Sequence, residues 1–177
     1  MSSLFLYLDE LRFLRNRLLM IDPSHIKVLK FIIDHLESKN ITWAITGSLS
    51  MALQGVPVIP NDIDIQTDEI GAYEIEKLFK DYVTRPITFY GDPSIKSHFG
   101  SITIFGIQVE IMGGVQKLLP NGTWEPPIDI QPHRQLIKLK GMDIPVLSLK
   151  YEESAYRKLG RIKRADFLKR YLENEES

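Results

Sequence analysis

A chain of 177 residues in which 44% are hydrophobic and 25% are charged is long enough to bury one good core. The 22 lysine and arginine residues nearly balance the 23 aspartate and glutamate residues, which excludes a global field that draws the protein to nucleic acid or to an anionic membrane. The absence of cysteine excludes disulfide scaffolds, thiolate zinc sites, iron–sulfur clusters and cysteine nucleophiles.

The first forty residues predict a helical extension. Leucines recur at helical spacing from Leu4 to Leu18, which indicates an amphipathic helix whose apolar stripe could pack internally or mediate a homodimer. Charged residues interrupt this stripe, unlike in a signal peptide or a membrane span, so we expect a cytoplasmic protein with no membrane partner. Asp22 followed by Pro23 is typical of a helix start, and a second helix should run from there to about Lys39.

The middle of the chain predicts short strands that alternate with helices. The period-two pattern and the turn residues predict strands over 42–46 and around 63–65, with a short helix over 49–54 between them. A helix over 72–82 and strands over 84–90, 101–105 and 108–112 should follow. We expect a loop or irregular hairpin over 113–127, where glycines and prolines gather, and a short strand over 128–130.

The end of the chain should be mostly helical over 149–172, with a break at Gly160. The whole chain, 1–177, is interpreted as one domain with an N-terminal helical extension (about 1–40) and a C-terminal helical tail (about 148–177). The predicted fold is α/β, of the α+β kind, with a small mixed, mainly antiparallel sheet flanked by helices. We expect the functional site at one edge of this sheet.

Three carboxylates carry the predicted chemistry. Asp62 and Asp64 alternate with buried isoleucines, so they should share one strand face, about 7 Å apart along the chain. Two like charges so close are unfavourable unless a cation lies between them, and hard carboxylate oxygens suit Mg²⁺ or Mn²⁺. Glu110 repeats the pattern on a later strand and would complete the metal site if the two strands are neighbours.

Gly47 and Ser48 lie where a strand turns into a helix. Such a turn can present backbone amides and a helix N-terminus to phosphate oxygens, and the Ser48 hydroxyl adds one donor. Amides that hold a triphosphate and carboxylates that hold the bridging metal together suit phosphoryl-group chemistry.

These motifs resemble the nucleotidyltransferase superfamily related to DNA polymerase beta. The sequence has Thr-Gly-Ser at 46–48, Asp-Ile-Asp at 62–64 and Val-Glu-Ile at 109–111, in the order of that family's signature. The resemblance implies transfer of a nucleoside monophosphate from a nucleoside triphosphate to an acceptor hydroxyl, with release of pyrophosphate. It implies Asp62, Asp64 and Glu110 as metal ligands and catalytic residues, Glu110 also as proton acceptor, and Gly47 and Ser48 as phosphate-binding residues.

The C-terminal segment resembles the helical tail of small bacterial and archaeal members of the superfamily, which include antibiotic-modifying and toxin–antitoxin nucleotidyltransferases. In several of them a tail lysine contacts the triphosphate, which makes Lys150 and Lys158 candidates here. The length of the chain favours a small-molecule or protein acceptor, and an RNA acceptor stays open.

Other interpretations fit the same residues. Asp62 and Asp64 could cap a turn and solvate an edge strand, Glu110 alone could face solvent, and Gly47 could simply start a helix. The basic residues of the tail could form a solvated helix face. A nucleotide-binding or regulatory module without turnover, or a metal-dependent phosphodiesterase, would use a similar set of groups.

Overall fold

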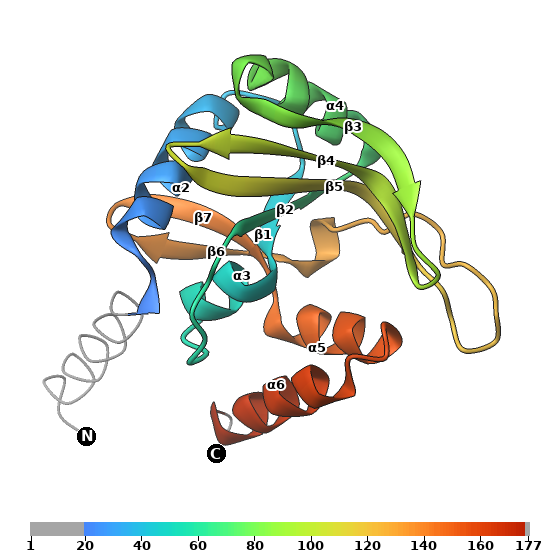
Figure 1. The fold of residues 1–177 in the computed structure, drawn as a ribbon. Coiled ribbons are helices and arrows are strands. Elements are labelled where there is room, and N and C mark those ends of the chain that lie inside the picture. Colours follow the sequence, from blue (N-terminus) through green and yellow to red (C-terminus); the bar gives the residue numbers. More distant parts are fainter. Residues whose placement is uncertain (1–19, 176–177) are drawn as a thin grey trace, which may run out of the picture.

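The computed structural model describes residues 20–175, and Figure 1 shows how they are arranged. The helix expected over 4–18, with its suggested role in a homodimer, lies outside the described residues. Helices cover a seven-stranded sheet, which confirms the α+β class. Within residues 20–175, no helix combines the length and the apolar content that crossing a membrane requires.

The sheet has the strand order β3-β4-β5-β2-β1-β7-β6. The strands are β1 (Trp43–Thr46), β2 (Ile63–Thr67), β3 (Val83–Gly91), β4 (Ile95–Ile104), β5 (Ile107–Lys117), β6 (Arg134–Leu139) and β7 (Met142–Leu147). In the described chain β2–β5 and β1–β7 pair in parallel and the other four pairings are antiparallel, which confirms a mixed, mainly antiparallel sheet. The strands of Asp64 and Glu110 are inner strands, so the expectation of a site at one edge of the sheet is wrong.

Two helices, α2 (Pro23–Leu36) and α4 (Glu69–Leu78), pack on one face of the sheet and bury the main apolar core there (Figure 1). Helix α2 begins as predicted, because the Asp22 carboxylate accepts a hydrogen bond from the Ser24 amide at 2.8 Å. Helix α4 begins three residues before the predicted start, because Asp68 caps it by accepting a hydrogen bond from the Gly71 amide. A short 3-10 helix, η1 (Lys80–Tyr82), then leads into β3.

Three further helices lie below the sheet in Figure 1: α3 (Gly47–Leu53), α5 (Leu149–Lys158) and α6 (Ile162–Glu175). They enclose a second apolar cluster, whose buried members are Met51, Val56, Leu149, Tyr156, Ala165 and Leu168. The backbone of Gly160, with φ of 71°, ends α5 and lets the chain turn into α6, as predicted.

The region between residues 113 and 147 differs from the prediction. Strand β5 continues to Lys117 through the predicted loop, with a register shift opposite Lys96 and His98. Residues 128–130 form no strand, and a 3-10 helix, η2 (Gln131–His133), leads instead into an unpredicted hairpin of β6 and β7. Its turn places Lys140 at positive φ, and Pro145 lies inside β7. Lysine is an unusual residue for a positive-φ turn position, and proline normally argues against a strand, which is why sequence patterns do not reveal this hairpin.

Candidate active site

Asp64 and Glu110 lie side by side in the middle of the sheet. Strands β2 and β5 are parallel neighbours, and Asp64 is paired in register with Glu110. Residues paired in register point to the same face, so both carboxylates lie on one side of the sheet. Their neighbours Ile63 and Ile65 are fully buried in the core on the other side. The strand pairing that the sequence could only assume is therefore present.

The three predicted carboxylates line one cavity of about 440 Å³. Asp62 lies directly before β2, two residues from Asp64. The Glu110 carboxylate accepts a hydrogen bond from the Gln108 side-chain amide at 3.1 Å. The other walls come from α5, α6 and the turn between them, including Tyr156. The cavity thus lies between the middle of the sheet and the C-terminal helix pair.

The turn at Gly47 brings the start of α3 against Asp64. Gly47 has φ of 67°, in the left-handed region, and a Cβ atom at this position would lie 2.3 Å from Asp64 Oδ2. Only glycine satisfies both the backbone conformation and the close approach. Ser48 follows and also lines the cavity. The structure therefore brings Gly47 and Ser48 together with the carboxylates, as the sequence pattern predicts.

A fourth carboxylate, that of Glu152 on α5, holds this turn by hydrogen bonds. It was not predicted from the sequence. Glu152 is 3% exposed, and its Oε1 accepts hydrogen bonds from Thr46 Oγ1 at 2.6 Å and from the Gly47 amide at 2.9 Å. The Gly47 amide is therefore already engaged. Its part in phosphate binding would come from the close backbone approach, and Ser48 would supply the donor.

Burial and neighbouring charges raise the pKa of three carboxyl groups of the cavity, those of Asp64, Glu110 and Glu152. Burial, followed by the charges of Asp62, Glu110 and Glu152, raises the pKa of Asp64 to about 7, although Arg161 acts in the opposite direction. Burial and the charge of Asp62 also raise the pKa of Glu110. Burial raises the pKa of Glu152 to about 7 against its two hydrogen bonds, which favour the ionised form. The cavity therefore holds more negative charge than its surroundings compensate.

This donor set fits a hard divalent cation by its chemistry. Carboxylate oxygens are the ligands that magnesium prefers, and the mutual repulsion of Asp62, Asp64 and Glu110 is what a cation would relieve. Among the described residues, no three acidic or histidine side chains are yet close enough to form a closed metal site. The carboxylates therefore line one cavity, but they are farther apart than the ligands of a single bound ion.

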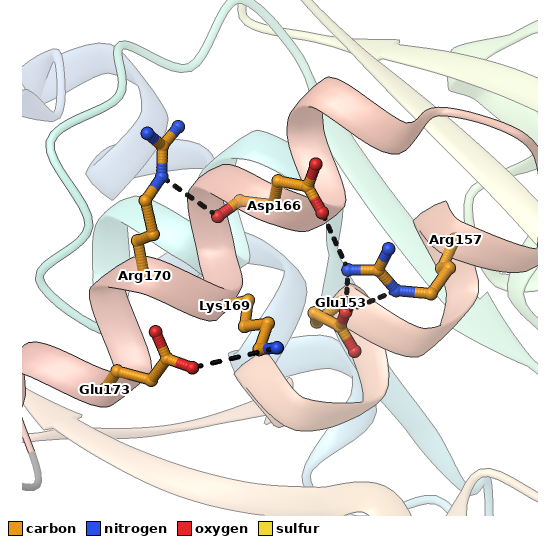
Figure 2. Close-up of polar contacts among 6 residues, drawn as sticks. All are labelled: Glu153, Arg157, Asp166, Lys169, Arg170 and Glu173. Atoms are coloured by element: carbon orange, nitrogen blue, oxygen red, sulfur yellow. Dashed lines mark hydrogen bonds and ion pairs between the residues drawn. The ribbon is translucent and has the colours of Figure 1, made fainter.

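The predicted tail lysines lie away from this cavity. In the described chain Lys158 contacts Glu125 and lines a neighbouring pocket, which Lys150 also lines. Some basic residues of the tail pair with acids of the tail itself: Arg157 contacts Glu153 at 2.6 Å and Asp166 at 3.0 Å, across the α5–α6 turn (Figure 2). In the same view Lys169 pairs with Glu173 at 3.8 Å.

Three cations that sequence patterns did not single out line the cavity instead. Arg161 precedes α6, Arg164 lies on α6, and Lys117 ends β5. Lys117 is only 4% exposed, and burial lowers its pKa. Its ammonium group donates to the Tyr151 hydroxyl at 3.3 Å, and the Gln66 amide donates to the same oxygen at 3.1 Å. The available sequence signal for the two arginines was the excess of basic residues over 157–164. Such an excess does not show which side chains face the cavity and which face solvent.

Comparison with known proteins places the chain in a family. A family model described as aminoglycoside-2''-adenylyltransferase matches residues 28–169. The solved structure of a candidate nucleotidyltransferase from Thermotoga maritima is 50% identical, covers 88% of this chain and 96% of its own, and superposes with a TM-score of 0.77.

Two structures of ANT(2'')-Ia share the fold at much lower identity. The crystal structure in complex with adenylyl-2''-tobramycin is 12% identical, covers 86% of this chain and 92% of its own, and has a TM-score of 0.55. The solution structure is 11% identical, with coverages of 88% and 94% and a TM-score of 0.53. No curated protein matches the chain.

Proposed function

Because the chain is a nucleotidyltransferase that belongs to the aminoglycoside-2''-adenylyltransferase family, we propose that it transfers a nucleoside monophosphate from a metal-bound nucleoside triphosphate to a hydroxyl of an acceptor. The family description favours ATP as the donor. The resemblance to the nucleotidyltransferase superfamily that the sequence motifs indicate is thereby confirmed. A triphosphate substrate is also consistent with the cytoplasmic location expected from the sequence.

The triphosphate would lie between the glycine turn and the C-terminal helices. The Ser48 hydroxyl and the turn at Gly47 face the cavity from one side, and Arg161 and Arg164 face it from the other. Guanidinium groups suit phosphate oxygens because they donate two parallel hydrogen bonds. We assign the triphosphate to these two arginines in place of the tail lysines Lys150 and Lys158, which line other pockets.

Asp62, Asp64 and Glu110 would hold magnesium or manganese. When bound, the metal would neutralise charge on the triphosphate and favour attack at the alpha phosphorus. The paired position of Asp64 and Glu110 on adjacent strands fixes the spacing of two of these ligands. Asp62, at the entry to β2, has more freedom to adjust.

In the transfer step the acceptor oxygen forms a bond to the alpha phosphorus, and the bond from that phosphorus to the bridging oxygen of pyrophosphate breaks. The hydroxyl proton passes to the Glu110 carboxylate, which lines the cavity beside the other two carboxylates. The remaining contribution of the protein is to position both substrates in line and to compensate charge.

The observation that carries this proposal is the register of Asp64 with Glu110, beside a glycine whose Cβ would touch Asp64. The test is calorimetric titration of the purified protein with ATP, with and without Mg²⁺, in the wild type and in Asp64→Asn. We expect affinity that requires Mg²⁺ and that Asp64→Asn abolishes. Asp34→Asn, a change at an exposed helix position, is the control. Equal affinity in Asp64→Asn, or affinity that ignores Mg²⁺, would contradict the proposal.

A further inference from the structure

The face of the sheet that bears the carboxylates continues outward from Glu110. Glu110 is paired with Ser101 on β4, and Ser101 is paired with Arg85 on β3, the outermost strand on that side. The row Asp64, Glu110, Ser101 and Arg85 therefore crosses four adjacent strands. The charge of Arg85 acts on Glu110, whose pKa it lowers against the effect of burial. Arg85 thus belongs to the same surface as the candidate active site.

The Arg85 guanidinium group lies over two aromatic rings. Its guanidinium carbon is 4.7 Å from the centroid of Phe99 and 5.1 Å from that of Tyr90. Cation–π contact at these distances orients a guanidinium group and leaves its N–H edge free to donate. Arg85 is exposed, and among the ion pairs formed within residues 20–175 none involves it. We call Arg85, Tyr90 and Phe99 the arginine–aromatic shelf.

The charges beside the shelf are also cationic. Lys96 on β4 lies 3.8 Å from the centroid of the Trp124 ring. The acid of the β3–β4 hairpin, Asp92, is engaged by its own turn: its Oδ1 accepts hydrogen bonds from the Ser94 amide, the Ser94 hydroxyl and the Ile95 amide. Residues 83–104 therefore carry two cations, Arg85 and Lys96, against one acid, Asp92, a balance that disfavours a polycation such as an aminoglycoside.

We propose that the acceptor carries an anionic group, a carboxylate or a phosphate, which Arg85 binds while the acceptor hydroxyl lies beside Glu110. This inference rests on the proposed function and specifies its acceptor. Two strand spacings, about 10 Å, separate the backbones of Arg85 and Glu110, so the anion and the reacting hydroxyl lie at opposite ends of a small molecule. Arg85 then determines specificity, and the rings of Tyr90 and Phe99 keep it in position.

The test compares acceptors of different charge. The probes are 4-(hydroxymethyl)benzoate, 4-(hydroxymethyl)phenyl phosphate, the neutral 4-(hydroxymethyl)benzamide and the polycation tobramycin. Each is titrated into protein saturated with Mg²⁺ and a non-hydrolysable ATP analogue, and each is assayed for pyrophosphate release with ATP. The proteins are the wild type, Arg85→Gln, and the control Lys27→Gln, which removes another exposed cation that lies 4.2 Å from the centroid of an aromatic ring, Phe105.

We expect the wild type to bind an anionic probe at least about tenfold more tightly than the amide, the effect of one charge-assisted hydrogen bond. Arg85→Gln should remove this preference and leave ATP affinity unchanged, and Lys27→Gln should keep both. The comparison of benzoate with phosphate identifies which anion is preferred. No preference in the wild type, a preference that survives in Arg85→Gln, or tightest binding of tobramycin would overturn the proposal. If the wild type showed no Mg²⁺-dependent ATP binding at all, the proposed function itself would be overturned.

Discussion

Replacing Gly47 by alanine places a methyl group against the central carboxylate. The new Cβ would lie 2.3 Å from Asp64 Oδ2, far inside contact distance, so the Asp64 side chain must rotate away. The left-handed backbone at Gly47 adds a strain of about 1–2 kcal/mol for any residue with a Cβ atom. Displacing a ligand in this way should weaken Mg²⁺-dependent ATP binding by about 10–100-fold, the range found when the support of a metal ligand is removed.

The chain offers a control with the same strain and no collision. Gly141 in the β6–β7 turn has φ of 77°, and a Cβ there would meet nothing within 4 Å. Urea unfolding should therefore show a loss of stability of about 1–2 kcal/mol for Gly141→Ala and at least as large a loss for Gly47→Ala. Calorimetric titration with ATP and Mg²⁺ should show weakened binding for Gly47→Ala alone. Equal ATP affinity in the two variants would refute the assigned role of the glycine turn.

Three further predictions concern the charges of the cavity. The pKa values of Asp64 and Glu152 are raised to about 7 in the folded protein. Between pH 5 and pH 7 the folded state therefore holds protons that the unfolded state has released. The free energy of unfolding of the metal-free protein should consequently fall by about 2–5 kcal/mol between pH 5 and pH 8. Urea titrations at both pH values measure this, and stability that rises over the interval would contradict the shifts. Glu152→Ala leaves the buried Thr46 hydroxyl and the half-buried Gly47 amide unpaired and should cost about 2–4 kcal/mol of stability in thermal unfolding. Glu152→Gln keeps an acceptor and should cost much less, and equal losses would show that these hydrogen bonds contribute little. Arg161→Gln should lower ATP affinity about tenfold in calorimetry, because Arg161 lines the cavity. Lys158→Gln should leave ATP affinity unchanged, because the Lys158 ammonium group pairs with Glu125 outside the cavity. A loss of ATP affinity in Lys158→Gln but not in Arg161→Gln would instead identify the tail lysine as the triphosphate ligand.

The part of the site that could be predicted from the sequence is the part built by local patterns. Alternation along a strand places Asp64 opposite to Ile63 and Ile65, and a glycine at the end of a strand marks a turn, whatever lies elsewhere in the chain. That Glu110 meets Asp64 depends on two strands being neighbours, which the resemblance to a known family suggested and local patterns could not.

Two of the site residues that the sequence did not reveal, Glu152 and Lys117, are charged side chains that become buried under segments distant in the sequence. Glu152 stands beside Glu153 in a polar helix, and no sequence feature distinguishes the buried carboxylate of Glu152 from the half-buried one of Glu153. Lys117 follows a glycine pair and was expected in a loop, whereas β5 continues to it and buries it. Burial of a charged side chain follows from what packs over it, and that cover comes from parts of the chain far away in sequence.

The hydrogen bonds from Thr46 and Gly47 to Glu152 join residues 106 and 105 positions apart. During synthesis the glycine turn leaves the ribosome long before the helix that supports it. A nascent chain that has not yet released α5 therefore holds this turn with its hydroxyl and amide donors unmatched, and the arginines that face the cavity emerge later still. We expect nucleotide capture to begin only when translation has passed the C-terminal helix pair, because both helices contribute walls of the cavity.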